Sequence, residues 1–172
     1  MSGLDTVRRS SLSTVRLQPV EPVVAESGPM HVRAEHFPLE SSSRLQIVDV
    51  TDDVMTRVRD LGVREGVATL QSLHTTCAVF VNESQDALCV DFATFLASVI
   101  DPDASWKHDD PVHSDCDRRN TDSHLRALLM SPSVTLQVSG GELVLGHWQR
   151  VMIAELDGPR TRTFRLQVMG IV

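Results

Sequence analysis

Hydrophobic and polar residues alternate along the chain from His31 onward. Residues 31–37 and 44–50 each follow the two-residue period that is typical of a β-strand. Proline and serine residues gather between them, over 38–43, and these residue types favour turns. The pattern therefore predicts a β-hairpin over residues 31–50.

A short helical pattern follows this segment. Thr51 is a good N-cap residue, two aspartates come directly after it, and Val54, Val58 and Leu61 recur at helical spacing. Gly62 then favours the left-handed backbone that often ends a helix. We expect an amphipathic helix between Thr51 and Gly62.

The middle of the chain predicts two strands and a longer helix. Residues 67–73 and 77–82 are rich in apolar and β-branched side chains, as in buried strands. Residues 86–100 place large apolar side chains on one broad helical face: Leu88, Phe92, Phe95, Leu96, Val99 and Ile100. We expect this segment to be the main core helix, ending at Asp101 and Pro102.

The C-terminal part predicts a third helix and four strands. Asn120 or Thr121 caps the helix, which stops before Pro132. The strands are expected at 134–138, 143–147, 151–156 and 163–169. A hairpin turn at Gly140-Gly141 joins the first two. The element order is ββαββααββββ, which indicates an α+β fold and not a doubly wound sheet.

Two stretches stand apart from this regular pattern. Residues 103–120 form a long polar segment, and loops of this length inside a compact domain are usually functional. Residues 1–30 carry few large side chains, too few to offset the entropy of ordering. We therefore expect a disordered tail over 1–30 and a single domain over 31–172.

Composition and missing motifs narrow the function. Only 4% of the residues are aromatic and the net charge is -7, which disfavours nucleic acid as a partner. No apolar run is long enough for a membrane span, so we expect a soluble, cytoplasmic protein. Three cysteines without a CxxC pair predict reduced thiols. There is no GxGxxG, P-loop or GxSxG motif.

Histidines supply the first candidate chemistry. His108 in the polar loop and His124 at the start of the third helix are expected to converge on one divalent ion, with Asp86 or Glu155 as an acidic ligand. The alternative is that both are ordinary surface histidines, because no HxH or HExxH spacing supports a metal site. His74 follows a predicted strand, and from its position alone a turn histidine bonded to a backbone carbonyl is the favoured interpretation.

Arginine and cysteine residues add two further points. Residues 157–159 read as a β-turn, which leaves Arg160 unexplained and well placed to hold a phosphate group. Cys77 and Cys89 fall in a predicted strand and helix, where small core residues are expected. Cys116 lies in the polar loop and is the cysteine to test for reactivity.

Several polar blocks, taken in order, resemble the YjbQ-type family, formerly the uncharacterised family 0047, over about residues 31–169. The most specific segment is 133–151, which contains Gly140-Gly141 and Gly146-His147-Trp148-Gln149. The remaining matched blocks are His74-Thr75-Thr76, Asn82-Glu83-Ser84-Gln85-Asp86, Asn120-Thr121-Asp122-Ser123-His124-Leu125 and Glu155-Leu156-Asp157-Gly158-Pro159-Arg160.

The resemblance implies a mixed β-sandwich with flanking helices, assembled as a homotrimer, with a polar cleft. Some family members are named secondary thiamine-phosphate synthases, which implies a transferase acting on small phosphorylated metabolites with a divalent ion, Mg or Zn. The implied roles are catalytic for His74, Glu155, Asn82 and Gln149. They are substrate-binding for Thr75, Thr76, Glu83, Trp148 and Arg160, and metal-binding for His108, His124 and Asp86.

Two positions depart from the family pattern, and two other functions stay open. His147 stands where the family usually has Thr, and Trp106 stands where it usually has Tyr. One alternative is a trimer that binds a metal or metabolite without turnover. The other is a metal-dependent phosphoester hydrolase, for which His147 would supply an extra ligand.

Overall fold

The computed structural model describes residues 26–172, so most of the predicted tail lies outside the described part of the chain. The element order agrees with the expected ββαββααββββ, with one short 3-10 helix added. The elements are β1 (Met30–Glu40), β2 (Gln46–Asp49), α1 (Thr51–Leu61), β3 (Glu65–Ser72), β4 (Cys77–Asn82), α2 (Asp86–Val99), η1 (Lys107–Asp109), α3 (Thr121–Leu129), β5 (Ser133–Ser139), β6 (Glu142–Leu143), β7 (Arg150–Glu155) and β8 (Thr161–Ile171).

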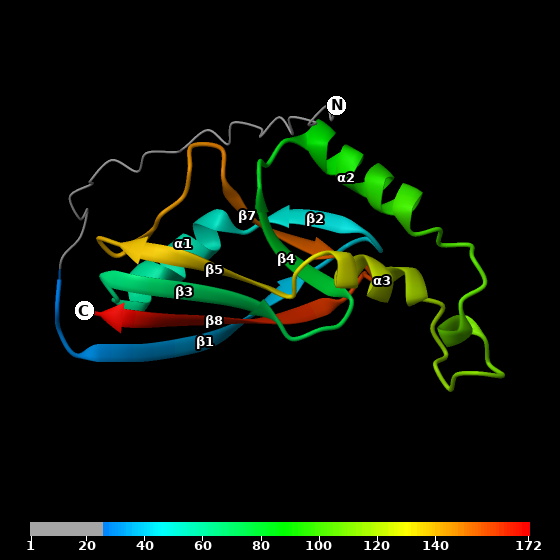
Figure 1. Cartoon of the computed structure of the whole chain (residues 1–172), viewed down its shortest axis with the longest axis horizontal. Helices are drawn as coiled ribbons and strands as arrows, with labels where there is room; N and C mark the ends of the chain where they lie inside the picture. The colour runs from blue at the N-terminus through cyan, green and yellow to red at the C-terminus, as the bar shows by residue number, and fades with distance from the viewer. Residues whose placement is uncertain (1–25) are drawn as a thin grey trace, which may run out of the picture.

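Two antiparallel sheets form the body of the α+β fold (Figure 1). The larger sheet has the order β1-β8-β3-β5-β6, and the smaller one has the order β2-β7-β4. Leu70 and Phe164 from the larger sheet pack in one buried cluster with Val79 and Ile153 from the smaller sheet and Val58 from α1. This apolar core holds the sheets and α1 together. None of the helices in the described part is long and apolar enough to cross a membrane.

The predicted hairpin over residues 31–50 is wrong. β1 pairs with β8 along its whole length, whereas β2 pairs with β7 in the other sheet. Pro38 lies inside β1, opposite Thr163, and is tolerated because β1 is an edge strand with one side unpaired. Alternation identified both strands correctly, but alternation carries no information about which strand is the partner.

The helix over 51–61 is confirmed, although its first turn differs from the expectation. Val50 is the N-cap residue, and Thr51 is already helical. The Thr51 hydroxyl donates to Asp49 at 2.6 Å and accepts the Val151 amide at 2.8 Å, so it connects α1 to both β2 and β7. Gly62 ends the helix with φ of 69°, the left-handed backbone that glycine adopts readily.

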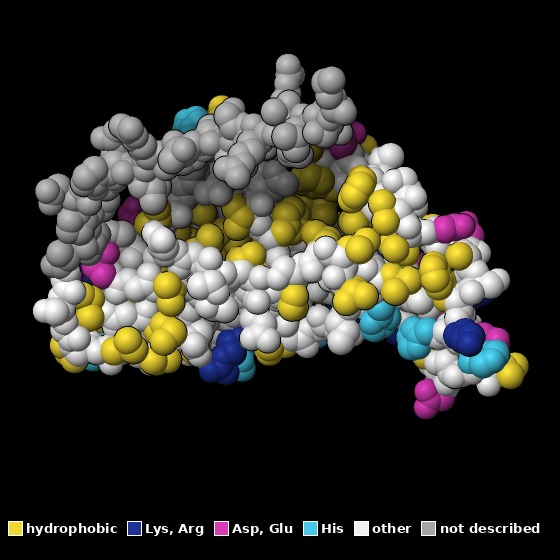
Figure 2. Space-filling view, in the orientation of Figure 1, with side chains coloured by type: hydrophobic (Ala, Val, Ile, Leu, Met, Phe, Trp, Pro, Cys, Tyr) yellow, Lys and Arg dark blue, Asp and Glu magenta, His cyan; other side chains and the backbone are white. Residues whose placement is uncertain are grey.

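α2 is not the main core helix. Leu96 is its one fully buried residue, while the side chains of Val90 and Phe95 are 64% and 62% exposed. Figure 2 shows apolar side chains gathered where α2 lies in Figure 1. An amphipathic pattern shows that a helix face favours apolar contacts, but it does not show that the same chain supplies them.

The strand expected at 143–147 is also shorter than predicted. β6 ends at Leu143 after two residues, and an irregular segment over 144–149 leads to β7. The Gly146 amide donates to the Gln149 side chain at 2.8 Å, which closes a tight turn here. The preceding turn is confirmed, because Gly140 and Gly141 both have positive φ angles.

Candidate functional site

The candidate residues fall at the two opposite ends of the smaller sheet. Glu155 ends β7 opposite Cys77, while Arg150 begins β7 opposite Asn82. Six residues of strand separate these ends by about 17 Å. The first end holds His74, Thr75, Thr76, Glu155, Arg160, His108 and His124. The second end holds Asn82, Glu83, Trp148 and Gln149.

A fully buried ion pair anchors the first end. Arg162 in β8 donates from Nε and Nη2 to both carboxylate oxygens of Glu155 in β7, the second at 2.6 Å. Thr76 accepts a further bond from Arg162 at 3.0 Å. Burial alone would raise the pKa of Glu155, but the bonds from Arg162 and the Asp157 amide hold it below the ordinary value. Glu155 is therefore ionised and positions its neighbours.

His74 lies half-buried beside this pair, in the loop between β3 and β4. Its Nε2 accepts the backbone amide of Thr163 at 2.8 Å, so the neutral ring carries its proton on Nδ1. Burial and the charge of Arg162 lower the pKa of His74, against the opposing effect of Glu155. His74 is a neutral imidazole with Nδ1–H free to contact a ligand. Thr75 beside it is exposed.

Two buried aspartates hold the arginines of this end. Asp157 accepts the Asn120 side-chain amide at 2.9 Å and pairs with Arg118 and Arg160, each at 3.1 Å. Asp122, at the start of α3, pairs in the same way with Arg44 at 2.8 Å and Arg126 at 2.9 Å. Four guanidinium groups are thus fixed around two carboxylates. Sequence reasoning explained Asp157 as a turn residue and included Asp122 only within a matched block. It missed Arg126 and Arg44.

His108 and His124 come together as the sequence indicated. Their ring centroids are 5.2 Å apart and the ring planes are perpendicular. Asp109 supports the pair by accepting the amide and hydroxyl of Thr121, which joins the loop to α3. Asp86, at the start of α2, does not join them, because no group of three or more His, Cys, Asp or Glu side chains among residues 26–172 could hold a metal ion. Burial is the main cause of the raised pKa of Cys89 in the same helix, and the charges of Asp86 and Asp49 add to it.

Buried side-chain nitrogen and oxygen atoms without a hydrogen-bond partner are confined to this first end among residues 26–172. They are His108 Nε2, Asn120 Oδ1, Asp122 Oδ2, Arg126 Nε and Arg160 Nη2. Two of them, on Asp122 and Arg160, still lie within ion-pair distance of an opposite charge. Because an unpaired buried polar atom is costly, such a cluster points to a ligand or water. The same residues contain no group of three or more His, Cys, Asp or Glu side chains arranged for a metal ion.

The remaining candidates are placed apart from these groups. His147 packs edge-on against Trp148, with ring centroids 4.5 Å apart, at the second end. It is therefore remote from the His108–His124 pair within one chain and gives no support to a hydrolase site there. Cys77 is buried, and burial raises the pKa of its thiol to about 12, which agrees with the core role expected from sequence. No signal in the sequence pointed to Asp49 or Arg150.

The fold and its polar strand ends define a class of small α+β proteins with two packed antiparallel sheets. Residues 35–171 match the family model described as UPF0047 protein YjbQ-like. The chain belongs to this family. It is 38% identical to the UPF0047 protein of Methanothermobacter thermautotrophicus, over 82% of this chain and 94% of the relative. It is 30% identical to the UPF0047 protein YugU of Bacillus subtilis, over 77% and 96%.

Solved structures agree with this assignment. A YbjQ-like protein of unknown function from Sulfolobus solfataricus P2 is 30% identical with a TM-score of 0.76, covering 82% of this chain and 99% of that one. A hypothetical protein from Aeropyrum pernix K1 is 35% identical with a TM-score of 0.74, covering 80% and 98%. The fold is therefore the fold of the family.

Removing Arg162 should destabilise the protein strongly. Arg162→Met leaves the Glu155 carboxylate buried and unpaired, so we expect the free energy of unfolding to fall by about 3–5 kcal/mol. Arg165→Met removes an exposed arginine from the same strand and should change stability by less than about 0.5 kcal/mol. Urea unfolding of both variants tests this, and equal effects would contradict the anchoring role of the pair.

His74 should titrate below its ordinary pKa of 6.5. Protonation breaks the bond from Thr163, so the unfolded chain takes up this proton first and folded stability falls as the pH drops below 6.5. NMR of the imidazole nitrogens should show the Nδ1–H form at neutral pH. An Nε2–H form, or titration above 6.5, would refute the described contact.

Proposed function

We propose that the first end of the smaller sheet binds a small phosphorylated metabolite. The observation that carries this proposal is that Asp157 holds Arg160 and Arg118 and also accepts the Asn120 side chain. The Asn120 backbone amide in turn donates to Asp109, beside the His108–His124 pair, and the five buried side-chain atoms of the described chain without a hydrogen bond lie on these loops and on α3. Guanidinium groups held in place by Asp157 are suited to phosphate oxygens, because little side-chain entropy is lost on binding. His74 adds a hydrogen-bond donor beside them.

The histidine pair offers two imidazole nitrogens, which are suitable ligands for a divalent ion. Two imidazoles bound to one ion at about 2.0–2.1 Å have ring centres about 5 Å apart, and the observed separation is 5.2 Å. His108 Nε2 is buried without a partner. Nitrogen ligands favour zinc over magnesium. Such an ion would neutralise charge on a phosphate group.

The reaction that we propose is the joining of a pyrimidine methyl diphosphate to a thiazole phosphate. A bond forms between the methylene carbon and the thiazole nitrogen, while the carbon–oxygen bond breaks and its electron pair leaves with the diphosphate. In this proposal Arg160 and Arg118 stabilise the charge that develops on the leaving oxygens. His74 orients the substrate, and Glu155 acts through Arg162 as a positioning residue.

Binding without turnover is the second candidate, and one observation favours it. Of the residues assigned to catalysis or substrate binding, Asn82, Glu83, Trp148 and Gln149 lie about 17 Å from Glu155 along β7. A single chain therefore does not gather all of them around one small molecule. A protein that only holds a phosphorylated metabolite needs the first end alone.

Activity with both substrates separates the two candidates. Purified protein given the pyrimidine diphosphate, the thiazole phosphate and a divalent ion should form thiamine phosphate. His124→Ala should lower the rate at least about tenfold, because one ligand of the ion is lost. His113→Ala changes an exposed histidine of the polar loop before α3 and should leave the rate unaltered. Bound metabolite with no product would favour binding alone, and an unchanged rate in His124→Ala would remove that residue from the mechanism.

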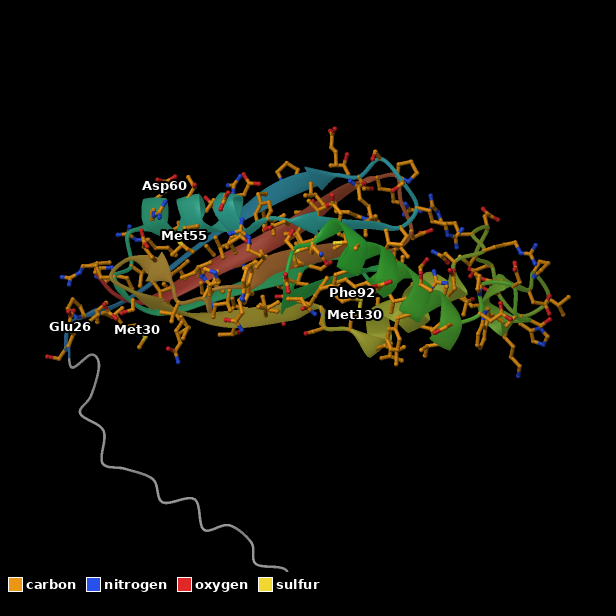
Figure 3. All side chains as sticks on the ribbon, turned by 90° about the horizontal axis from the view of Figure 1, so that it is seen from above. Glu26, Met30, Met55, Asp60, Phe92 and Met130 are labelled. Carbon is orange, nitrogen blue, oxygen red and sulfur yellow. The ribbon has the colours of Figure 1, made fainter. Side chains whose placement is uncertain are left out.

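We also propose that the chain forms a homotrimer through α2 and α3. Exposed apolar side chains on these helices include Val90, Phe95, Val99, Leu128 and Leu129. Phe92 and Met130, labelled in Figure 3, line an apolar groove between the two helices. A patch of this kind favours association with another copy over contact with water.

Light scattering tests the assembly. The unaltered chain should have about three times the mass of one protomer, and Phe95→Lys should shift it towards the protomer mass. Arg165→Lys, on an exposed strand position away from the patch, should leave the mass unchanged. A single-protomer mass for the unaltered chain would refute the proposal.

A further inference from the structure

The second end of the smaller sheet contains a hollow that the proposed reaction does not use. Its volume is about 410 Å³, within the range of small-molecule sites. The lining residues come from the ends of β2 and β7 and from the loops beside them: Asp49, Glu83, Ser84, His147, Trp148 and Arg150. A second hollow, of about 430 Å³, shares His147 and Arg150 with it.

Trp148 gives this hollow an aromatic wall. Its side chain is 67% exposed, although a large apolar ring is usually covered. His147 packs against it with the ring planes at 82° and so restricts its rotation. A flat ligand that stacks on the exposed indole would remove apolar surface from water without displacing protein contacts.

The charges in the hollow favour a positive ligand. Arg150 is already paired with Asp49 at 2.9 Å and lies 3.8 Å from Asp52, so two carboxylates neutralise its charge. Glu83 makes no ion pair within the described chain, and its carboxylate is exposed. An uncompensated carboxylate therefore lies beside an exposed indole ring, and this combination attracts aromatic cations.

We propose that the second end is a separate binding site for a flat aromatic ring that carries a positive charge. Trp148 stacks on the ring, and Glu83 supplies the opposite charge. Arg150 and Asp49, held together, form the base of the site. This inference goes beyond the phosphate site of the first end and does not depend on the reaction proposed there.

Two tryptophans make the test specific. Trp106 lies in the polar loop near the first end and Trp148 lies at the second end, so their indole N–H signals in NMR report the ends separately. The probes are 1-methylnicotinamide, which is a cation, and nicotinamide, its neutral counterpart. We expect the cation to move the Trp148 signal in a saturable way while the Trp106 signal stays in place. The neutral probe should bind at least about fivefold more weakly.

Variants assign the contacts. Glu83→Gln should weaken binding of the cation about fivefold or more and leave nicotinamide unchanged. Asp60→Asn removes the same charge from the exposed side of α1, labelled in Figure 3, and should change the affinity less than twofold. Equal affinity for the two probes, linear shifts of both tryptophan signals, or an unaltered affinity in Glu83→Gln would overturn the proposal.

The measurement of cation binding does not depend on the first end. The measurement needs neither a metal ion nor turnover, and His124→Ala should bind 1-methylnicotinamide as the unaltered chain does. If the unaltered chain forms no thiamine phosphate and still binds the cation, the proposed reaction alone is refuted. Loss of cation binding in His124→Ala would refute the independence of the two ends.

Discussion

The pairing of Glu155 with Arg162 is the constraint on which the first end depends. Glu155 belongs to the smaller sheet and Arg162 to the larger one, so their bidentate bond fixes one sheet against the other. Neither charge is tolerated alone in this surrounding, because each would be buried without compensation. The same carboxylate accepts the Asp157 amide. The turn that carries the arginine-binding Asp157 is thereby placed beside α3.

The sequence predicted the kinds of element better than their partners. Alternation and helical spacing identified β1, α1 and β4 within a few residues, because these patterns follow from the geometry of one strand or helix. The hairpin between β1 and β2 was wrong because pairing is decided across the whole sheet. The role of α2 was wrong for a related reason, since an apolar face does not reveal what covers it.

The candidate site shows the same contrast between local patterns, which the sequence reveals, and long-range partners, which it does not. Their residue type alone made His108 and His124 candidate metal ligands, and the structure places their rings together. Residue type did not bring out Asp122 or Asp157, because an aspartate in a turn or at a helix start is usually explained by local backbone bonds. Their function as partners of several arginines exists only in three dimensions. The separation of Trp148 from His74 was likewise hidden, since chain order does not give the sheet end at which a residue lies.

The length of β7 has a consequence for how such a protein diverges. A buried central strand acts as a fixed spacer, and shifting it by one residue would exchange the side chains of its two buried faces. Substitutions beyond either end of β7 do not disturb this buried packing. His147 lies beyond one terminus, so a substitution there alters one extremity of the sheet and leaves the opposite extremity untouched. The residues at one extremity can thus change while those at the other are preserved.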